Sequence, residues 1–141
     1  MPYDLERFIV EQDRVYDAVL AELGLGRKTS HWIWFIFPQL AGLGHSPMSR
    51  RFGIASLDEA RAYLAHPVLG PRLRECTGLV LAIQGRTAEE IFGSLDAMKI
   101  RSSMTLFHRA APNDPEFALV LDRYYGGVAD DATDERLTRP G

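Results

Sequence analysis

Apolar residues recur at intervals of three and four along most of the chain, which is the spacing of an amphipathic helix. The first stripe covers residues 5–23 and is followed by Gly24, a residue typical of the position after a helix C-terminus. Further stripes cover residues 57–66, 69–83, 94–110 and 115–124. The pattern therefore predicts an all-α fold of about seven helices, forming one compact domain over residues 1–141.

Polar residues at the expected helix starts support these boundaries. Ser56 and Thr87 each precede a glutamate by three residues, which is the spacing of a capping box. The second box opens a short helix that should end at Gly93. Ser94 and Asp114, the latter followed by proline, are predicted to cap the next two helices.

The segment 32–37 carries both tryptophans and two phenylalanines, and its structure has two interpretations. Aromatic and β-branched side chains favour a strand, but a lone strand would leave its backbone groups without a partner. The alternative, which we favour, is a short buried helix capped by Ser30 and ended by Pro38. On a helix Trp32 and Trp34 would point about 200° apart, so that one packs while the other lines a cleft. On a strand they would share one face. We expect this segment at the centre of the domain.

Composition and charge exclude several classes of protein. The net charge of −3 and the isoelectric point near 5.8 argue against a nucleic-acid partner. The apolar run at 32–37 is six residues long, whereas a membrane helix needs about 20, and the N-terminus lacks the apolar core of a signal peptide. The single cysteine, Cys76, allows no internal disulfide and fits a reducing compartment. We therefore expect a cytoplasmic protein without a membrane partner.

Carboxylates are missing from two long windows, residues 23–57 and 97–113, although the chain contains 19 of them. An anionic ligand would require such an exclusion, because a nearby carboxylate would repel it. Both windows are also rich in basic residues. If they form one site, Arg50 or Arg51 should lie within about 8–10 Å of Lys99 or Arg101.

Seven residues in and around these windows are candidates for chemistry. His31, beside the aromatic segment, is the candidate catalytic residue and could act as a general base. The ligand-binding candidates offer a stacking indole, an amide, guanidinium groups, an ammonium and a hydroxyl: Trp34, Gln39, Arg50, Arg51, Lys99 and Ser103. Each also has a structural explanation, as a packed, capping or solvated side chain. The four histidines lack metal-ligand spacing, so we expect neither a metal nor a cofactor.

Strings at residues 30–44, 63–73 and 99–107 resemble those of the domain of unknown function 1810 family, and the likeness extends over roughly residues 5–137. The resemblance implies a mainly helical, stand-alone bacterial domain and carries no established reaction. Some members bear a calpastatin label, for which this sequence offers no physical basis. A weaker similarity, in residues 29–32, is to the NAD- and ADP-ribose-associated family, whose members act on ADP-ribosyl groups. The acidic residue of that family's motif is absent here.

These observations lead to two hypotheses from different classes. The first is a site that binds or processes a phosphate-bearing nucleotide derivative such as ADP-ribose, with both windows lining one concave pocket. The second is a non-catalytic protein-interaction or structural domain, in which the same side chains pack and cap. The acidic stretch after Gly126 would either offset the basic windows or fold over them as a lid. The sequence predicts no oligomeric state.

Overall fold

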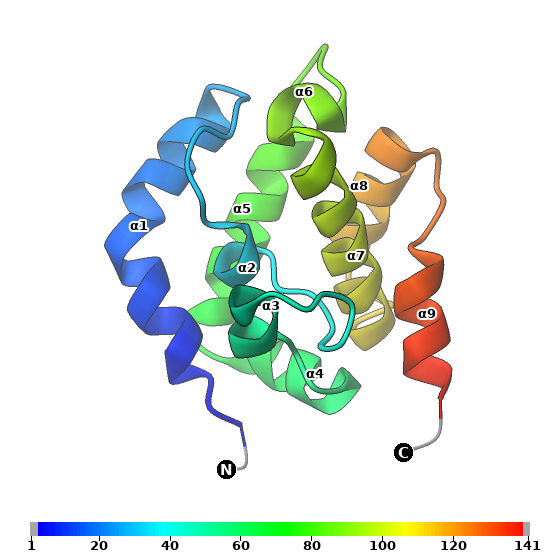
Figure 1. Cartoon of the computed structure of the whole chain (residues 1–141). Helices are drawn as coiled ribbons and strands as arrows, with labels where there is room; N and C mark the ends of the chain where they lie inside the picture. Colours follow the sequence, from blue (N-terminus) through cyan, green and yellow to red (C-terminus); the bar gives the residue numbers. More distant parts are fainter. Residues whose placement is uncertain (1–2, 140–141) are drawn as a thin grey trace.

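The computed structural model describes residues 3–139, and within this range the chain is helical and has no β-strand (Figure 1). The helices are α1 (Glu6–Gly24), α2 (Ile33–Ile36), α3 (Pro47–Phe52), α4 (Leu57–Ala65), α5 (Leu69–Ala82), α6 (Ala88–Phe92), α7 (Ser94–Ala110), α8 (Pro115–Tyr125) and α9 (Asp131–Thr138). The all-α prediction is confirmed. Two short helices, α3 and α9, bring the number in the described range to nine instead of about seven.

Helix α7 connects most of the fold. It packs against α4, α6, α8 and α9, and the short α2 also contacts it. Helix α1 packs on α5, whereas α9 packs on α7, so these two helices form opposite edges of the protein (Figure 1). The segment that carries α2 and α3 lies between these edges, which places the first acid-free window next to the second.

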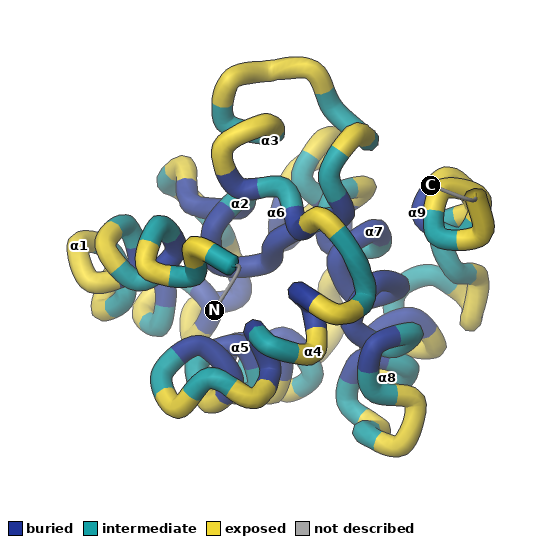
Figure 2. The backbone as a smooth tube through the Cα atoms, turned by 90° about the horizontal axis from the view of Figure 1, so that it is seen from below, coloured by how far each residue is buried: buried dark blue, intermediate teal, exposed yellow. Residues whose placement is uncertain are grey.

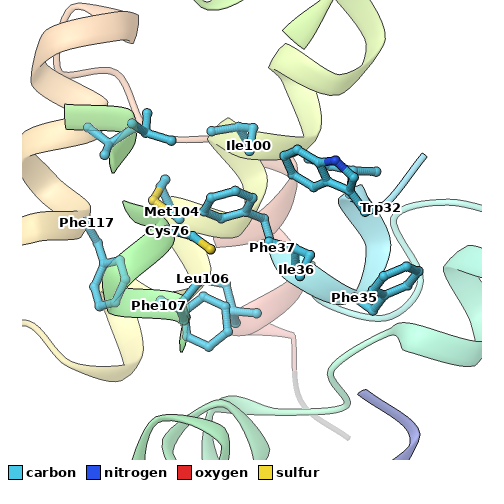
Figure 3. Close-up of a cluster of buried hydrophobic side chains, with 14 of the residues drawn as sticks. Trp32, Phe35, Ile36, Phe37, Cys76, Ile100, Met104, Leu106, Phe107 and Phe117 are labelled. Atoms are coloured by element: carbon cyan, nitrogen blue, oxygen red, sulfur yellow. The ribbon is translucent and has the colours of Figure 1, made fainter. Parts of the chain in front are cut away.

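A single cluster of buried apolar side chains holds the helices together. Aromatic rings from distant parts of the sequence meet in it (Figure 3). The ring centroids of Trp32 and Phe37 are 6.2 Å apart, and those of Phe107 and Phe117 are 5.8 Å apart. Trp32 is fully buried, so the aromatic segment lies inside the core as expected.

The aromatic segment is helical over Ile33–Ile36, which confirms the helical alternative. Trp32 is inside the core, while Trp34 is only partly buried and lines a cavity. The prediction that Ser30 caps this helix is wrong, because its hydroxyl donates a 2.5 Å hydrogen bond to the Glu22 carboxylate instead. Trp32 occupies the N-cap position without a side-chain capping bond.

The two helices that the sequence did not reveal have few apolar positions. Helix α3 is six residues long and buries only Phe52. It begins after Ser46, whose side chain accepts a hydrogen bond from Ser49 N. Helix α9 buries only Thr133, and Figure 2 shows it as a largely exposed helix at the edge of the protein. Neither helix has an apolar stripe that periodicity could detect.

The helix caps follow the sequence in part. The reciprocal capping box of Thr87 with Glu90 is complete, as predicted. Ser56 caps α4, but the Glu59 carboxylate accepts from Ala55 N instead of returning to Ser56. Asp114 is the N-cap residue of α8 and is followed by proline, as predicted, although its side chain makes no capping hydrogen bond. The prediction that Ser94 caps α7 is wrong, because Gly93 occupies the N-cap position.

One backbone feature matters for the sites below. Leu40 and Ile54 form an isolated parallel bridge, in which Ala41 N donates to Ile54 O at 2.7 Å and Ile54 N donates to Gln39 O at 2.9 Å. This bridge fixes the segment after α2 against the segment after α3. Within residues 3–139, no helix is long and apolar enough to cross a membrane.

Candidate functional site

The two acid-free windows meet at Asp96, in the first turn of α7. Lys28 Nζ, from the loop after α1, lies 2.7 Å from Asp96 Oδ2, and Lys99 Nζ lies 3.5 Å from Asp96 Oδ1. Each ammonium also lies 5.0 Å from the centroid of an indole ring, Lys28 over Trp32 and Lys99 over Trp34. Asp96 therefore links Lys28 of the first window to Lys99 of the second. Each of these two lysines lies over a tryptophan of the first window.

In the folded structure, carboxylates from outside the two windows lie against them, so the expectation that the site excludes carboxylates is wrong. Besides Asp96, Glu22 turns back onto the start of the first window. Its carboxylate accepts hydrogen bonds from Thr29 N at 2.7 Å, from the Ser30 backbone and hydroxyl, and from Trp32 Nε1 at 2.9 Å. Burial acts to raise the pKa of Glu22, but the hydrogen bonds outweigh it and lower the pKa to about 2.

Several cations of the windows hold secondary structure together. Arg101 donates to the Val128 and Ala129 carbonyls, at 2.9 and 3.1 Å. Arg109 makes two 2.8 Å hydrogen bonds to the Asp134 carboxylate. This partnership lowers the pKa of Asp134. The acidic C-terminal stretch therefore lies over the second window and also offsets part of its positive charge, so the two alternatives are found together.

A cavity of about 270 Å³ nevertheless opens between the segment 39–49, α7 and the start of α9. We call it the Lys99 groove. Its lining combines polar side chains with apolar ones: Gln39, Leu43, Gly44, Ser49, Leu95, Met98, Lys99, Ser102, Asp130 and Ala132. A narrower cavity of about 10 Å³, lined by Trp34, adjoins it and shares four of these residues. Residues of both windows thus line one concave site.

The polar groups of the groove are arranged by α7 and by the N-cap of α9. Asp130 Oδ2 accepts from Ser102 Oγ at 3.0 Å and from Thr133 N and Oγ1 at 3.1 and 2.5 Å. These bonds leave Oδ1 without a partner among residues 3–139. The Trp34 indole N–H is buried and also has no hydrogen-bond partner in the described range. The groove therefore offers one cation and one anion, and the adjoining cavity lined by Trp34 adds an unpaired donor.

The structure separates the sequence-based candidates into two groups. Gln39 and Lys99 line the groove, and Trp34 lines the adjoining cavity. The other candidates, His31, Arg50, Arg51 and Ser103, do not line the groove.

The candidates outside the groove have different environments. His31 and Arg50 are exposed. Arg51 stacks on Phe52, with 4.9 Å between Cζ and the ring centroid, and lies 3.4 Å from Glu11 on α1. Ser103 is fully buried, and its hydroxyl has no partner within residues 3–139. The catalytic role of His31 and the contribution of the other three residues to ligand binding stay predictions.

Sequence reasoning missed Ser49 and Asp130 as groove residues. Ser49 belongs to α3, which periodicity did not reveal, and Asp130 belongs to the acidic stretch treated as a lid. The spacing of Asp130 and Thr133 is that of a helix N-cap and its third residue, and this signal would have found α9. Among residues 3–139, no group of three or more histidine, cysteine, aspartate or glutamate side chains could hold a metal ion.

Comparisons with known proteins agree on an uncharacterised family. The family model described as "Protein of unknown function (DUF1810)" matches residues 2–137. The crystal structure of the conserved hypothetical protein Rv1873 from Mycobacterium tuberculosis is similar, with a TM-score of 0.97 and 54% sequence identity. The alignment covers 99% of this chain and 100% of that one. No curated protein matches the chain.

Proposed function

This chain belongs to the DUF1810 family, and we propose that its Lys99 groove binds a phosphate-bearing nucleotide derivative such as ADP-ribose. The observation that carries the proposal is the convergence of both acid-free windows on one cavity, with Lys99 placed over Trp34. The family description gives no reaction, so the ligand class is argued from the chemistry of the groove.

Charge in the groove suits a phosphate group with hydroxyl groups beside it, as in the ribose phosphate part of ADP-ribose. Lys99 is the cation available to a phosphate oxygen, and its contact with Asp96 is 3.5 Å long, so a closer anion can compete for it. Asp130 Oδ1 can accept hydrogen bonds from a ribose diol, because Oδ2 already accepts the protein's own donors. A polyanion without hydroxyl groups would be repelled by Asp130.

The apolar lining suits the rest of such a ligand. Leu43 and Met98 can contact the face of a base, while Gln39 offers an amide to its polar edge. The volume of about 270 Å³ lies just below the roughly 300–1,000 Å³ typical of ligand pockets. A ribose phosphate with part of its base is of that order, and a larger derivative would extend along α9.

A protein-interaction role is the second candidate, and one observation favours it. Leu95 and Met98 at the rim of the groove are 75% and 68% exposed. They lie three residues apart, hence on one face of α7. Exposed apolar residues beside a cavity also occur at ligand entrances, so a binding experiment is needed to separate the two roles.

Isothermal titration with ADP-ribose, and with ribose 5-phosphate as the minimal fragment, tests the proposal. Removing one charge-assisted contact costs about 1.5–3 kcal/mol, so Lys99→Gln should weaken binding about 10- to 100-fold. Asp130→Asn should weaken ADP-ribose more than inorganic phosphate, because only the former carries a diol. The matched control is Arg27→Gln, which removes an exposed cation of the first window that does not line the groove.

Arg50→Gln and Arg51→Gln in the same titrations test whether these two arginines reach the ligand. The proposal would be defeated if none of ADP-ribose, NAD and ribose 5-phosphate bound the wild-type protein. Equal binding by Lys99→Gln and Arg27→Gln would place any ligand elsewhere. Either result would leave the interaction role as the better account of the exposed Leu95 and Met98.

A further inference from the structure

A second and larger cavity adjoins the segment that follows α2. Its volume is about 610 Å³, and it shares no lining residue with the Lys99 groove. It lies between α9 and the segments on either side of the Leu40–Ile54 bridge. Its lining is Leu40, Ala41, Ala55, Ser56, Leu57, Arg136, Leu137 and Arg139. We call this cavity the Arg136 groove.

The Arg136 groove has a mixed lining whose backbone is already formed: Ser56, Arg136 and Arg139 are its polar side chains, and leucines and alanines supply the rest. Leu40 is only 5% exposed, and the bridge with Ile54 fixes the backbone on which Leu40 and Ala41 sit. Leu57 at the start of α4 and Leu137 on α9 add apolar surface from either side. A preformed groove with apolar surface binds a hydrocarbon chain without the entropic cost of ordering its own backbone.

One guanidinium is seated in the wall of this groove by the backbone. Arg136 Nε donates to Ala41 O at 2.6 Å. The rest of the guanidinium lies against Gly42, where a Cβ would overlap it. Gly42 has a φ of +93°, so its lack of a side chain serves both the turn and the close approach of Arg136.

This guanidinium has no negative partner within residues 3–139. Most cations of the described range lie within ion-pair distance of a carboxylate, including the neighbouring Arg139, which contacts Glu135 at 2.9 Å. Arg136 instead uses Nε on a carbonyl, and its two Nη groups make no hydrogen bond within the described residues. A fixed fork of unpaired N–H donors beside a cavity is suited to a bidentate carboxylate.

We propose that the Arg136 groove binds an amphipathic monocarboxylate of the fatty-acid type. Its carboxylate pairs with the Arg136 guanidinium, and its hydrocarbon chain lies against the partly exposed Leu57 and Leu137. Of the two arginines that line the groove, Arg139 is already paired with Glu135, so Arg136 offers a single uncompensated charge and one carboxylate fits better than a polyphosphate.

Isothermal titration with straight-chain carboxylates from hexanoate to dodecanoate, each below its micelle concentration, tests this site. Affinity should rise by up to about fourfold for each added methylene until the groove is filled. The alcohol of the same chain length should bind at least about tenfold more weakly than the carboxylate. Arg136→Gln should remove that difference, whereas Arg14→Gln, an exposed arginine on α1, should preserve it.

Three results would overturn the proposal. Carboxylates and alcohols of equal length could bind equally to the wild-type protein, or no carboxylate could bind. Arg136→Gln could also weaken acid and alcohol by the same factor, which would show that this arginine only holds α9 in place. As an independent readout, dodecanoate should shift the amide resonance of Gly42 in the wild-type protein and leave that of Gly85, in the loop after α5, unchanged.

Discussion

Lys99 and Trp34 are stacked, with the Lys99 ammonium 5.0 Å from the centroid of the indole ring. The contact joins α7 to α2 and is of the cation–π type, worth about 0.5–1 kcal/mol at an accessible site. It also orders the ammonium next to the cavity that Trp34 lines. Residues of the two acid-free windows thus meet at one site, where Asp96 also contacts Lys99.

Trp32 and Trp34 should differ sharply in their contribution to stability. Trp32 is fully buried and donates to Glu22, so Trp32→Ala should lower the free energy of unfolding by about 3–5 kcal/mol. Trp34→Phe should cost less than about 1.5 kcal/mol, because the ring stays apolar and its N–H has no partner to lose within the described range. Urea denaturation of both variants measures the difference. A loss below 1 kcal/mol for Trp32→Ala would contradict its burial.

Glu22 should make stability depend on pH. Its folded-state pKa is about 2, below the ordinary value of 4.5, so its contribution is complete at neutral pH and is lost as the pH falls from about 4.5 toward 2. We expect this contribution to be about 1–3 kcal/mol. Glu22→Gln should therefore destabilise the protein at pH 7 but have little further effect near pH 2.

The pH experiment compares Glu22→Gln with Glu11→Gln by urea denaturation at pH 7, 4 and 2.5. Glu11 makes only a 3.4 Å contact with Arg51, so its loss should matter little at any pH. Parallel stability curves for the wild-type protein and Glu22→Gln between pH 7 and 2.5 would show that the hydrogen bonds to this carboxylate do not stabilise the fold.

Two glycines of α5 should respond oppositely to alanine. A Cβ at Gly70 would overlap the backbone carbonyl of Leu64, so Gly70→Ala must push α4 and α5 apart and should cost about 1–3 kcal/mol. Gly78 has nothing within 4 Å of the same position, so Gly78→Ala should stabilise the helix by roughly 0.5–1 kcal/mol. Thermal unfolding of the pair is the measurement. Changes of the same sign would contradict the close α4–α5 approach.

Helix α9 should open before the rest of the protein. It buries one residue, Thr133, and is held chiefly by polar contacts such as the paired bonds of Arg109 and Asp134. Asp134→Asn should speed amide hydrogen exchange in residues 131–138 several-fold and leave α7 protected. Asp131→Asn, at an exposed position of the same helix, is the control. Uniform exchange across α7 and α9 would mean that α9 unfolds only with the core.

The sequence predicted the helices that bury an apolar stripe and missed those that do not. α1, α5, α7 and α8 each carry several buried apolar positions, and periodicity identifies them. α9 is stabilised by contacts to residues far away in the sequence, such as Arg136 to Ala41, and such contacts leave no local pattern.

The candidate site was predictable to a similar extent. The absence of carboxylates in two windows pointed to segments that do meet, and Gln39 and Lys99 do line one groove. The sequence could not show which charged residues from outside the two windows lie at the groove. Asp96 lies one residue before the second window, and Asp130 arrives from a helix with no apolar signal. Counting charges along the chain therefore overestimated the positive potential of the site.

The indole N–H resonances give the most direct test of the Lys99 groove. The chain has two tryptophans, so a proton–nitrogen correlation spectrum contains two such signals, and Trp34→Phe assigns them. Trp32 Nε1 is bonded to Glu22, whereas Trp34 Nε1 has no partner within residues 3–139 and lines the cavity that adjoins the groove. Titration with ADP-ribose should shift the Trp34 signal in a saturable way and leave the Trp32 signal in place. An unchanged Trp34 signal at saturating ADP-ribose would contradict the proposed site.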